Sequence, residues 1–265
     1  MFFHEYTVET IMGYAESATL DAIEFWPETP HFWLRGMPED ELRAALDAHP
    51  QLQLATVHAP ILDLNPCSIN PRVAEVSVAY ATEAVAFADR FGAEVVTVHP
   101  GRRTAKRPPS PEDFRKFDRL IAALREAASD VKIKVAIENM ERKVNYLLTS
   151  PEEVRRLLDK EDWLWFTLDV SHAMGTSLAE VGEFIEVCGD RLANVHLSRA
   201  VDGKMHLALS GHPDGHAVLE MLRDAHYAGP ITLELEDLRL DRAYSSDEKV
   251  ALIASECAFI RSVLG

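Results

Sequence analysis

The segment VKIKVAIENM, residues 131–140, is a short apolar run that ends on a carboxylate, Glu138. Five further apolar runs carry a histidine, aspartate or glutamate at or just beyond their carboxyl ends. The six runs are QLATVHAP (53–60), EVVTVHPG (94–101), KVAIENM (134–140), WFTLDVSH (165–172), NVHLS (194–198) and ITLELE (231–236). Their polar residues are His58, His99, Glu138, Asp169, His196 and Glu234.

Neighbouring residues of this set are 27 to 41 positions apart in the sequence. A strand, a helix and two connecting loops need about that much chain, since a βαβ unit takes ~30 residues or more. Side chains at the carboxyl ends of successive parallel strands converge at one end of a barrel. The spacing therefore predicts a (β/α)8 TIM barrel with the six residues at its catalytic end.

Apolar runs alternate with amphipathic stretches along the whole chain, which is typical of a parallel sheet covered by helices. Eight strands are expected, over residues 2–6, 21–26, 52–59, 94–99, 131–139, 164–170, 192–198 and 229–236. Eight strands favour a closed barrel over an open sheet. The length of 265 residues suits one such barrel, so a single domain is expected over residues 1–265.

The amino-acid composition argues against a nucleic-acid-binding protein and against a membrane-spanning one. Lys and Arg total 27 against 43 Asp and Glu, and the formal net charge is −16. A field of that sign repels polyanions, so nucleic acid is an unfavoured partner. Three separated cysteines, without a signal peptide or an apolar run of membrane-spanning length, predict a cytoplasmic protein. A homo-oligomer is left open.

The six polar residues are together typical of a metal centre. Each alone has an ordinary structural explanation, but a carboxylate such as Glu138 is costly to bury unless a cation or an arginine pairs with it. Mixed imidazole and carboxylate ligands suit Zn²⁺, Mn²⁺, Co²⁺ or Fe²⁺ better than Ca²⁺. One firm divalent metal site is therefore expected, with an optional second site beside it.

These motifs resemble the xylose-isomerase-like (β/α)8 superfamily, which includes sugar isomerases, sugar and sugar-phosphate epimerases, and endonuclease IV. The resembling segments are VHAP (57–60), VHPG (98–101), IENM (137–140), LDVSHA (168–173), VHLS (195–198) and LE (233–234). The resemblance implies a metal held by Glu138, Asp169, His196 and Glu234. It also implies that His58 and His99 join Glu138 at a second metal in metal-rich members, and that His172 binds substrate or a further metal.

The sequence departs from the family pattern after residue 196. Many relatives carry an Asp three residues after the strand-seven His, where this chain has Arg199. Relatives often continue with H-x-P-L-G-E-G, where this chain reads HLALSGH from His206. The usual Asp-x-His pair of a third metal is thus absent in its ordinary form, and Asp202 and His206 are the nearest candidates.

The first functional hypothesis is a metal-dependent isomerase or epimerase that acts on a sugar or sugar phosphate through an enediolate. By resemblance, Glu138 and Glu234 are the catalytic base and acid, and His172 orients a substrate oxygen. His58 and His99 bind either a second metal or the substrate.

Two loops on the expected catalytic face are candidates for substrate contacts. Residues 100–111 include Arg102 and Arg103, whose guanidinium groups suit a phosphate or carboxylate, although an ordinary solvated loop is the alternative. Arg199 and His206 are further substrate-binding candidates. The aromatic segment 27–38 either shields the site from water or packs against a neighbouring helix or subunit.

Two other hypotheses remain at this stage. An endonuclease IV-like phosphodiesterase is favoured by His58 and His99, which a one-metal isomerase does not require, and is disfavoured by the acidic charge. A barrel that binds a metal or ligand without turnover is the third possibility, and the intact pair Glu138 and Glu234 argues against it.

Overall fold

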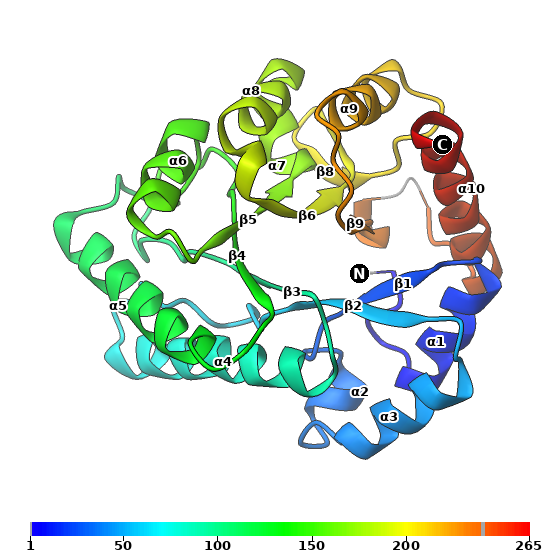
Figure 1. Ribbon diagram of the computed structural model, residues 1–265, viewed down its shortest axis with the longest axis horizontal. Coiled ribbons are helices and arrows are strands. Elements are labelled where there is room, and N and C mark those ends of the chain that lie inside the picture. The colour runs from blue at the N-terminus through cyan, green and yellow to red at the C-terminus, as the bar shows by residue number, and fades with distance from the viewer. Residues whose placement is uncertain (1, 240–241) are drawn as a thin grey trace.

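Seven parallel strands form one sheet that curls into a nearly closed barrel, with the helices around its outside (Figure 1). This is a computed structural model, and it describes residues 2–239 and 242–265. The strand order is β1-β2-β3-β4-β5-β6-β9, which follows the chain. The strands are β1 (Ala22–Phe25), β2 (Gln53–His58), β3 (Val95–Val98), β4 (Lys134–Glu138), β5 (Trp165–Asp169), β6 (Leu192–Leu197) and β9 (Ile231–Leu233). The predicted TIM-barrel fold is confirmed.

The helices begin where the sequence supplies caps. The side chains of Asn70, Ser150 and Ser245 each accept a hydrogen bond from the first turn of a helix, and Ser110 forms a capping box with Asp113. The longer helices are α1 (Val8–Ser17), α3 (Glu39–Ala48), α4 (Pro71–Arg90), α5 (Pro111–Ala128), α6 (Pro151–Lys160), α8 (Leu178–Cys188), α9 (Pro213–Asp224) and α10 (Ser246–Leu264). Among the described residues, no helix is both long and apolar enough to cross a membrane.

The expected strand at residues 2–6 is wrong, because these residues form turns. Phe2 is buried in a small cluster with Leu235 and Ile253, and Lys249 Nζ donates a 2.9 Å hydrogen bond to the Phe2 carbonyl. The segment therefore packs against α10 instead of pairing with a strand. As a result β1 and β9 are the two ends of the sheet, and an apolar cavity of about 510 Å³ lies between them.

Short elements that the sequence analysis did not predict lie mainly after strands. The aromatic segment 27–38 contains α2 (Pro30–Trp33), and α7 (Val170–Met174) follows β5 directly. Strands β7 (Arg199–Val201) and β8 (Lys204–Leu207) form an antiparallel hairpin outside the barrel sheet. The 3-10 helices η1 (Gly189–Arg191) and η2 (Asp237–Arg239) complete the list of described elements.

The barrel interior is layered, because alternate side chains of each strand point inward. Val95, Ala136 and Ala193 form an apolar cluster with Trp165 deep in the barrel. Above it lies a group that we call the polar layer, whose side chains are linked by hydrogen bonds. Its members are Glu24, Thr56, Thr97, Thr167, Asn194 and Thr232.

Phe166 tests the contribution of packing between the barrel and its outer helices. It is fully buried, and its ring stacks on Phe184 of α8 with centroids 5.7 Å apart. Phe166→Ala should lower the free energy of unfolding by about 3–5 kcal/mol, measured by urea denaturation. Phe114→Ala is the matched control, because that ring is 50% exposed and its loss should change stability by less than ~0.5 kcal/mol. Equal losses in the two variants would contradict this view of the core.

Candidate metal centre

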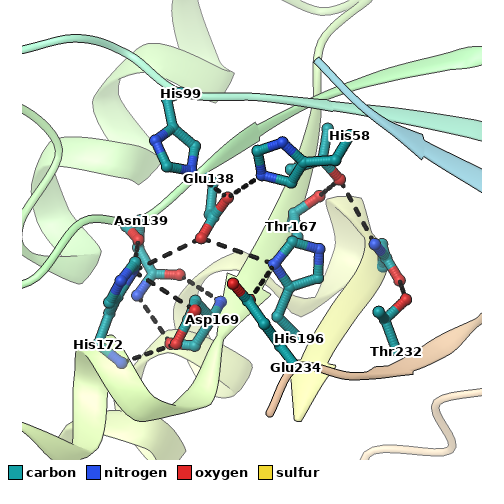
Figure 2. Close-up of polar contacts among 12 residues, drawn as sticks. His58, His99, Glu138, Asn139, Thr167, Asp169, His172, His196, Thr232 and Glu234 are labelled. Carbon is teal, nitrogen blue, oxygen red and sulfur yellow. Dashed lines mark hydrogen bonds and ion pairs between the residues drawn. The ribbon is translucent and has the colours of Figure 1, made fainter. Parts of the chain in front are cut away.

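The six residues singled out in the sequence lie together at the carboxyl ends of the strands (Figure 2). His58, Glu138 and Asp169 are the last residues of β2, β4 and β5, and His196 lies within β6 directly opposite Asp169. His99 directly follows β3, and Glu234 directly follows β9. The barrel topology therefore brings together residues that are up to 176 positions apart in the chain (58 to 234).

Four of these residues bring their ligand atoms close together, and we call them the quartet. Glu138, Asp169, His196 and Glu234 each offer one ligand atom, and these atoms all lie within 4.8 Å of one another. His196 Nδ1 is 2.9 Å from Glu234 Oε2 and 3.6 Å from Glu138 Oε1. Four donors at this separation fit around a single divalent cation.

His58 and His99 lie on the other side of Glu138 (Figure 2). Glu138 Oε2 is 3.4 Å from His58 Nε2 and 3.0 Å from His99 Nε2, whereas Oε1 faces His196. The two imidazole rings meet edge to face with centroids 5.0 Å apart. Glu138 is therefore placed to bridge the quartet and the histidine pair.

Asp169 is held so that one of its oxygens remains available. Oδ1 accepts hydrogen bonds from the His172 backbone N–H at 2.7 Å and from Ser171 Oγ at 3.0 Å, because Asp169 is the N-cap of α7. The Asn139 side chain also bridges β4 and β5, accepting from the Asp169 N–H and donating to the Asp169 carbonyl. Oδ2 has no hydrogen-bond partner among the described residues and lies 3.6 Å from His172 Nδ1.

Several of these buried atoms have no hydrogen-bond partner among the described residues. They are Glu138 Oε2, Asp169 Oδ2, Glu234 Oε2 and both ring nitrogens of His196. Buried polar atoms are almost always paired, so the unpaired atoms Asp169 Oδ2, Glu234 Oε2 and His196 Nδ1 on members of the quartet indicate a ligand there. Carboxylate and imidazole orphans fit a divalent cation, and the potential metal cluster foreseen in the sequence is present in the structure.

The charges of the centre are strongly coupled. Burial alone raises the pKa of Glu138, but His99 and His196 outweigh it and hold this pKa well below its ordinary value. Burial likewise raises the pKa of Glu234, and His196 more than reverses that effect. Burial lowers the pKa of His196, but Glu24, Glu138 and Glu234 raise it well above its ordinary value. In the metal-free centre the ionised forms of Glu138 and Glu234 and the protonated form of His196 are thus favoured, whereas burial raises the pKa of Asp169.

Of the other predicted site residues, some line a cavity beside the centre and others do not. His172 and Arg102 line a cavity of about 330 Å³ that also borders His99 and Tyr146. Arg103 instead donates to the Pro108 carbonyl, and Arg199 donates to the Ala208 carbonyl, so both bind backbone within or beside their own loops. Neither lines this cavity.

The hairpin β7–β8 brings His206 to the centre. Its Nδ1 lies 3.3 Å from both Ser171 Oγ and Ser198 Oγ and 3.9 Å from Glu234 Oε1. His206 also forms a possible ligand group with Asp169 and His172. Asp202, the other candidate for a third metal, is exposed at the hairpin turn with a φ of 50° and is not part of that group.

Glu24 is the residue of this region that the sequence analysis missed. Its carboxylate lies 3.0 Å from His196 Nε2, on the side of the ring opposite the quartet. A signal was present, because Glu24 is a carboxylate within the apolar run DAIEFW. The criterion of a polar residue at the carboxyl end of an apolar run does not select Glu24, because it lies inside its run.

Comparisons with known proteins agree with this architecture. The model of the family described as xylose isomerase-like TIM barrel matches residues 13–263. The chain is 29% identical to Uncharacterized protein MJ1188 of Methanocaldococcus jannaschii, over 100% of this chain and 97% of that protein.

Two solved structures share the fold. D-psicose 3-epimerase of Clostridium cellulolyticum, solved with D-tagatose, superposes with a TM-score of 0.78 at 16% identity and covers 98% of this chain and 94% of its own. Endonuclease IV of Thermus thermophilus superposes with a TM-score of 0.70 at 22% identity and covers 97% and 94%.

Glu138→Gln tests the ligand set. The amide is neutral and a poor metal ligand, so affinity for Zn²⁺ should fall by at least ~100-fold, since loss of an outer partner alone costs about 10–100-fold. Affinity would be measured by competition with a chromophoric chelator. Glu141→Gln is the matched control, because Glu141 pairs with Lys143 away from the quartet. An unchanged metal content in Glu138→Gln would show the ligand set to be wrong.

The raised pKa of His196 predicts how metal binding depends on pH. A metal ligand must be neutral imidazole, so binding has to expel the proton that the three carboxylates stabilise. Zn²⁺ affinity should therefore increase, with proton release, as pH rises through and above the ordinary histidine pKa of about 6.5. Calorimetry in buffers of different ionisation enthalpy counts the protons. Binding without proton release at neutral pH would contradict the charge state described above.

Proposed function

Because the chain belongs to the xylose isomerase-like TIM barrel family, we propose that it is a divalent-metal-dependent isomerase or epimerase of a small sugar or sugar phosphate. One observation carries the proposal: two carboxylates, the buried Glu138 and the partly exposed Glu234, face the same ring nitrogen of His196. A pair of carboxylates at one centre suits removal and return of a proton next to a carbonyl.

The centre also fits the cation that such chemistry needs. Glu138, Asp169, His196 and Glu234 would hold it, and Asp169 Oδ2, Glu234 Oε2 and His196 Nδ1 have no hydrogen-bond partner among the described residues. A divalent cation bound there would act as a Lewis acid that polarises the substrate carbonyl. Zn²⁺, Mn²⁺, Co²⁺ and Fe²⁺ all suit this set of ligands.

The two glutamates would divide the proton transfers between them. One carboxylate accepts the proton from the carbon beside the carbonyl, and the electron pair of that C–H bond moves into an enediolate. The other glutamate would take up a proton from solvent and deliver it to the neighbouring carbon, or to the opposite face of the same carbon. The lowered pKa of the accepting carboxylate favours the ionised form that the first step requires.

The cavity of about 330 Å³ supplies a place for the substrate, and its size is that of a small-molecule site. His172 Nδ1 donates a 2.9 Å hydrogen bond to the Asn139 carbonyl, which leaves Nε2 available for a substrate oxygen. Arg102 lies on the same cavity wall as Tyr146 and would pair with an anionic group at the far end of the substrate.

An endonuclease IV-like phosphodiesterase is the second candidate, and one observation favours it. His58 and His99 converge on the second oxygen of Glu138, as two ligands of a second metal would. Paired metals suit attack on a phosphodiester. The net charge of −16 and the engagement of Arg103 by its own loop argue against a duplex as substrate.

Solvent-isotope exchange separates the two candidates. The metal-loaded protein would be incubated in D₂O with ketoses, ketose phosphates and an abasic-site duplex. Deuterium should enter the carbon beside the carbonyl of one sugar. Faster exchange into phosphorylated sugars would support the role of Arg102. Cleavage of the duplex without exchange into any sugar would overturn the isomerase proposal in favour of the phosphodiesterase.

Glu234→Gln tests whether the two glutamates, Glu138 and Glu234, catalyse that exchange. Exchange should fall by about 10²–10⁴-fold when one member of the pair is lost, with rates compared at saturating metal because Glu234 is also a ligand. Glu220→Gln on α9 is the matched control, since that side chain is 45% exposed and outside the centre. Exchange at the wild-type rate in Glu234→Gln would contradict its role.

A further inference from the structure

The strands that carry the centre share a second sequence pattern, two positions before the candidate ligands. Five of the six polar residues at the strand ends are preceded, two positions earlier, by a small polar side chain. The pairs are Thr56 and His58, Thr97 and His99, Thr167 and Asp169, Asn194 and His196, and Thr232 and Glu234. Alternate residues of a strand share a face, so the earlier members form the polar layer directly beneath the centre.

Glu24 is the only carboxylate of that layer. Its Oε2 accepts hydrogen bonds from Thr56 Oγ1 at 2.6 Å, Asn194 Nδ2 at 2.8 Å and Thr232 Oγ1 at 3.4 Å. These donors come from β2, β6 and β9, so they fix the carboxylate from three sides. The other oxygen, Oε1, is left facing His196 Nε2 at 3.0 Å.

A buried carboxylate needs a cationic or hydrogen-bonding partner. Among the described residues, no lysine or arginine forms an ion pair with Glu24, and His196 is the partner that the structure provides. The distance between Nε2 and Oε1 is that of a hydrogen bond, although Nε2 has no hydrogen-bond partner among the described residues. The remaining nitrogen, Nδ1, faces Glu138 and Glu234.

We propose that Glu24 is a positioning residue of the metal centre, holding the proton of His196 on Nε2 so that the Nδ1 lone pair faces the metal. Metal-ligating histidines commonly donate their second N–H to a carboxylate, which fixes both tautomer and ring orientation. The inference rests on the metal centre of the proposed function and adds a residue that touches neither the metal nor the substrate.

Zn²⁺ titration of the full chain tests this role without any substrate. Glu24→Ala should weaken Zn²⁺ binding about 10–100-fold. Glu24→Gln should recover part of that loss, because its amide oxygen still accepts from Nε2–H. Thr97→Val is the matched control, since Thr97 belongs to the polar layer but contacts Thr167 and Asn194, not Glu24 or His196. It should bind Zn²⁺ within about threefold of wild type.

An NMR measurement on the wild type tests the proposed tautomer of His196 even if Glu24→Ala does not fold. Long-range ¹H–¹⁵N NMR of the Zn²⁺-loaded wild type should show His196 with a protonated Nε2 and a coordinated Nδ1. Coordination through Nε2 would overturn the inference, as would equal Zn²⁺ affinity in wild type and Glu24→Ala. If the wild type bound no Zn²⁺, Mn²⁺, Co²⁺ or Fe²⁺, the proposed metal centre itself would fall, a result distinct from failure of Glu24 alone.

Discussion

The carboxylate of Glu138 lies between imidazoles on both sides, and the arrangement of the centre follows from that contact. One oxygen faces His58 and His99, and the other faces His196. A carboxylate that is only 1% exposed would be strongly destabilised without such partners. The partners come from β2, β6 and the residue after β3, so the charge can be accommodated only when these strands curl around β4.

That geometry gives the centre two sides, and the two proposed functions use them differently. The quartet on the Oε1 side suits a single cation beside a substrate carbonyl. The histidine pair on the Oε2 side suits a second cation or a substrate oxygen. The two functions proposed for this chain differ chiefly in what would occupy the Oε2 side.

Much of the fold and the centre could be predicted from the sequence, because both depend on local patterns. Apolar runs that end in His, Asp or Glu marked the ends of β2 to β6 and β9, and parallel topology requires such ends to meet. Residues 2–6 were mispredicted because their apolar pattern is the same whether they pair with a strand or pack against α10. The cavity contacts of Arg102, and the engagement of Arg103 by Pro108, depend on loop conformation that no periodicity encodes.

The polar layer makes the inside of this barrel unlike an ordinary apolar core. Its threonine and asparagine side chains hydrogen-bond across β3, β5, β6 and β9, and Thr97 and Thr167 meet at 2.9 Å. The candidate ligands and the polar layer therefore form two adjacent layers of side chains, and most of the strands contribute one residue to each. Transferring the six candidate ligands to another barrel would reproduce the layer of ligands without the polar layer beneath it. The carboxylate of Glu24 has to be transferred with them, together with the Thr56, Asn194 and Thr232 side chains that hold it.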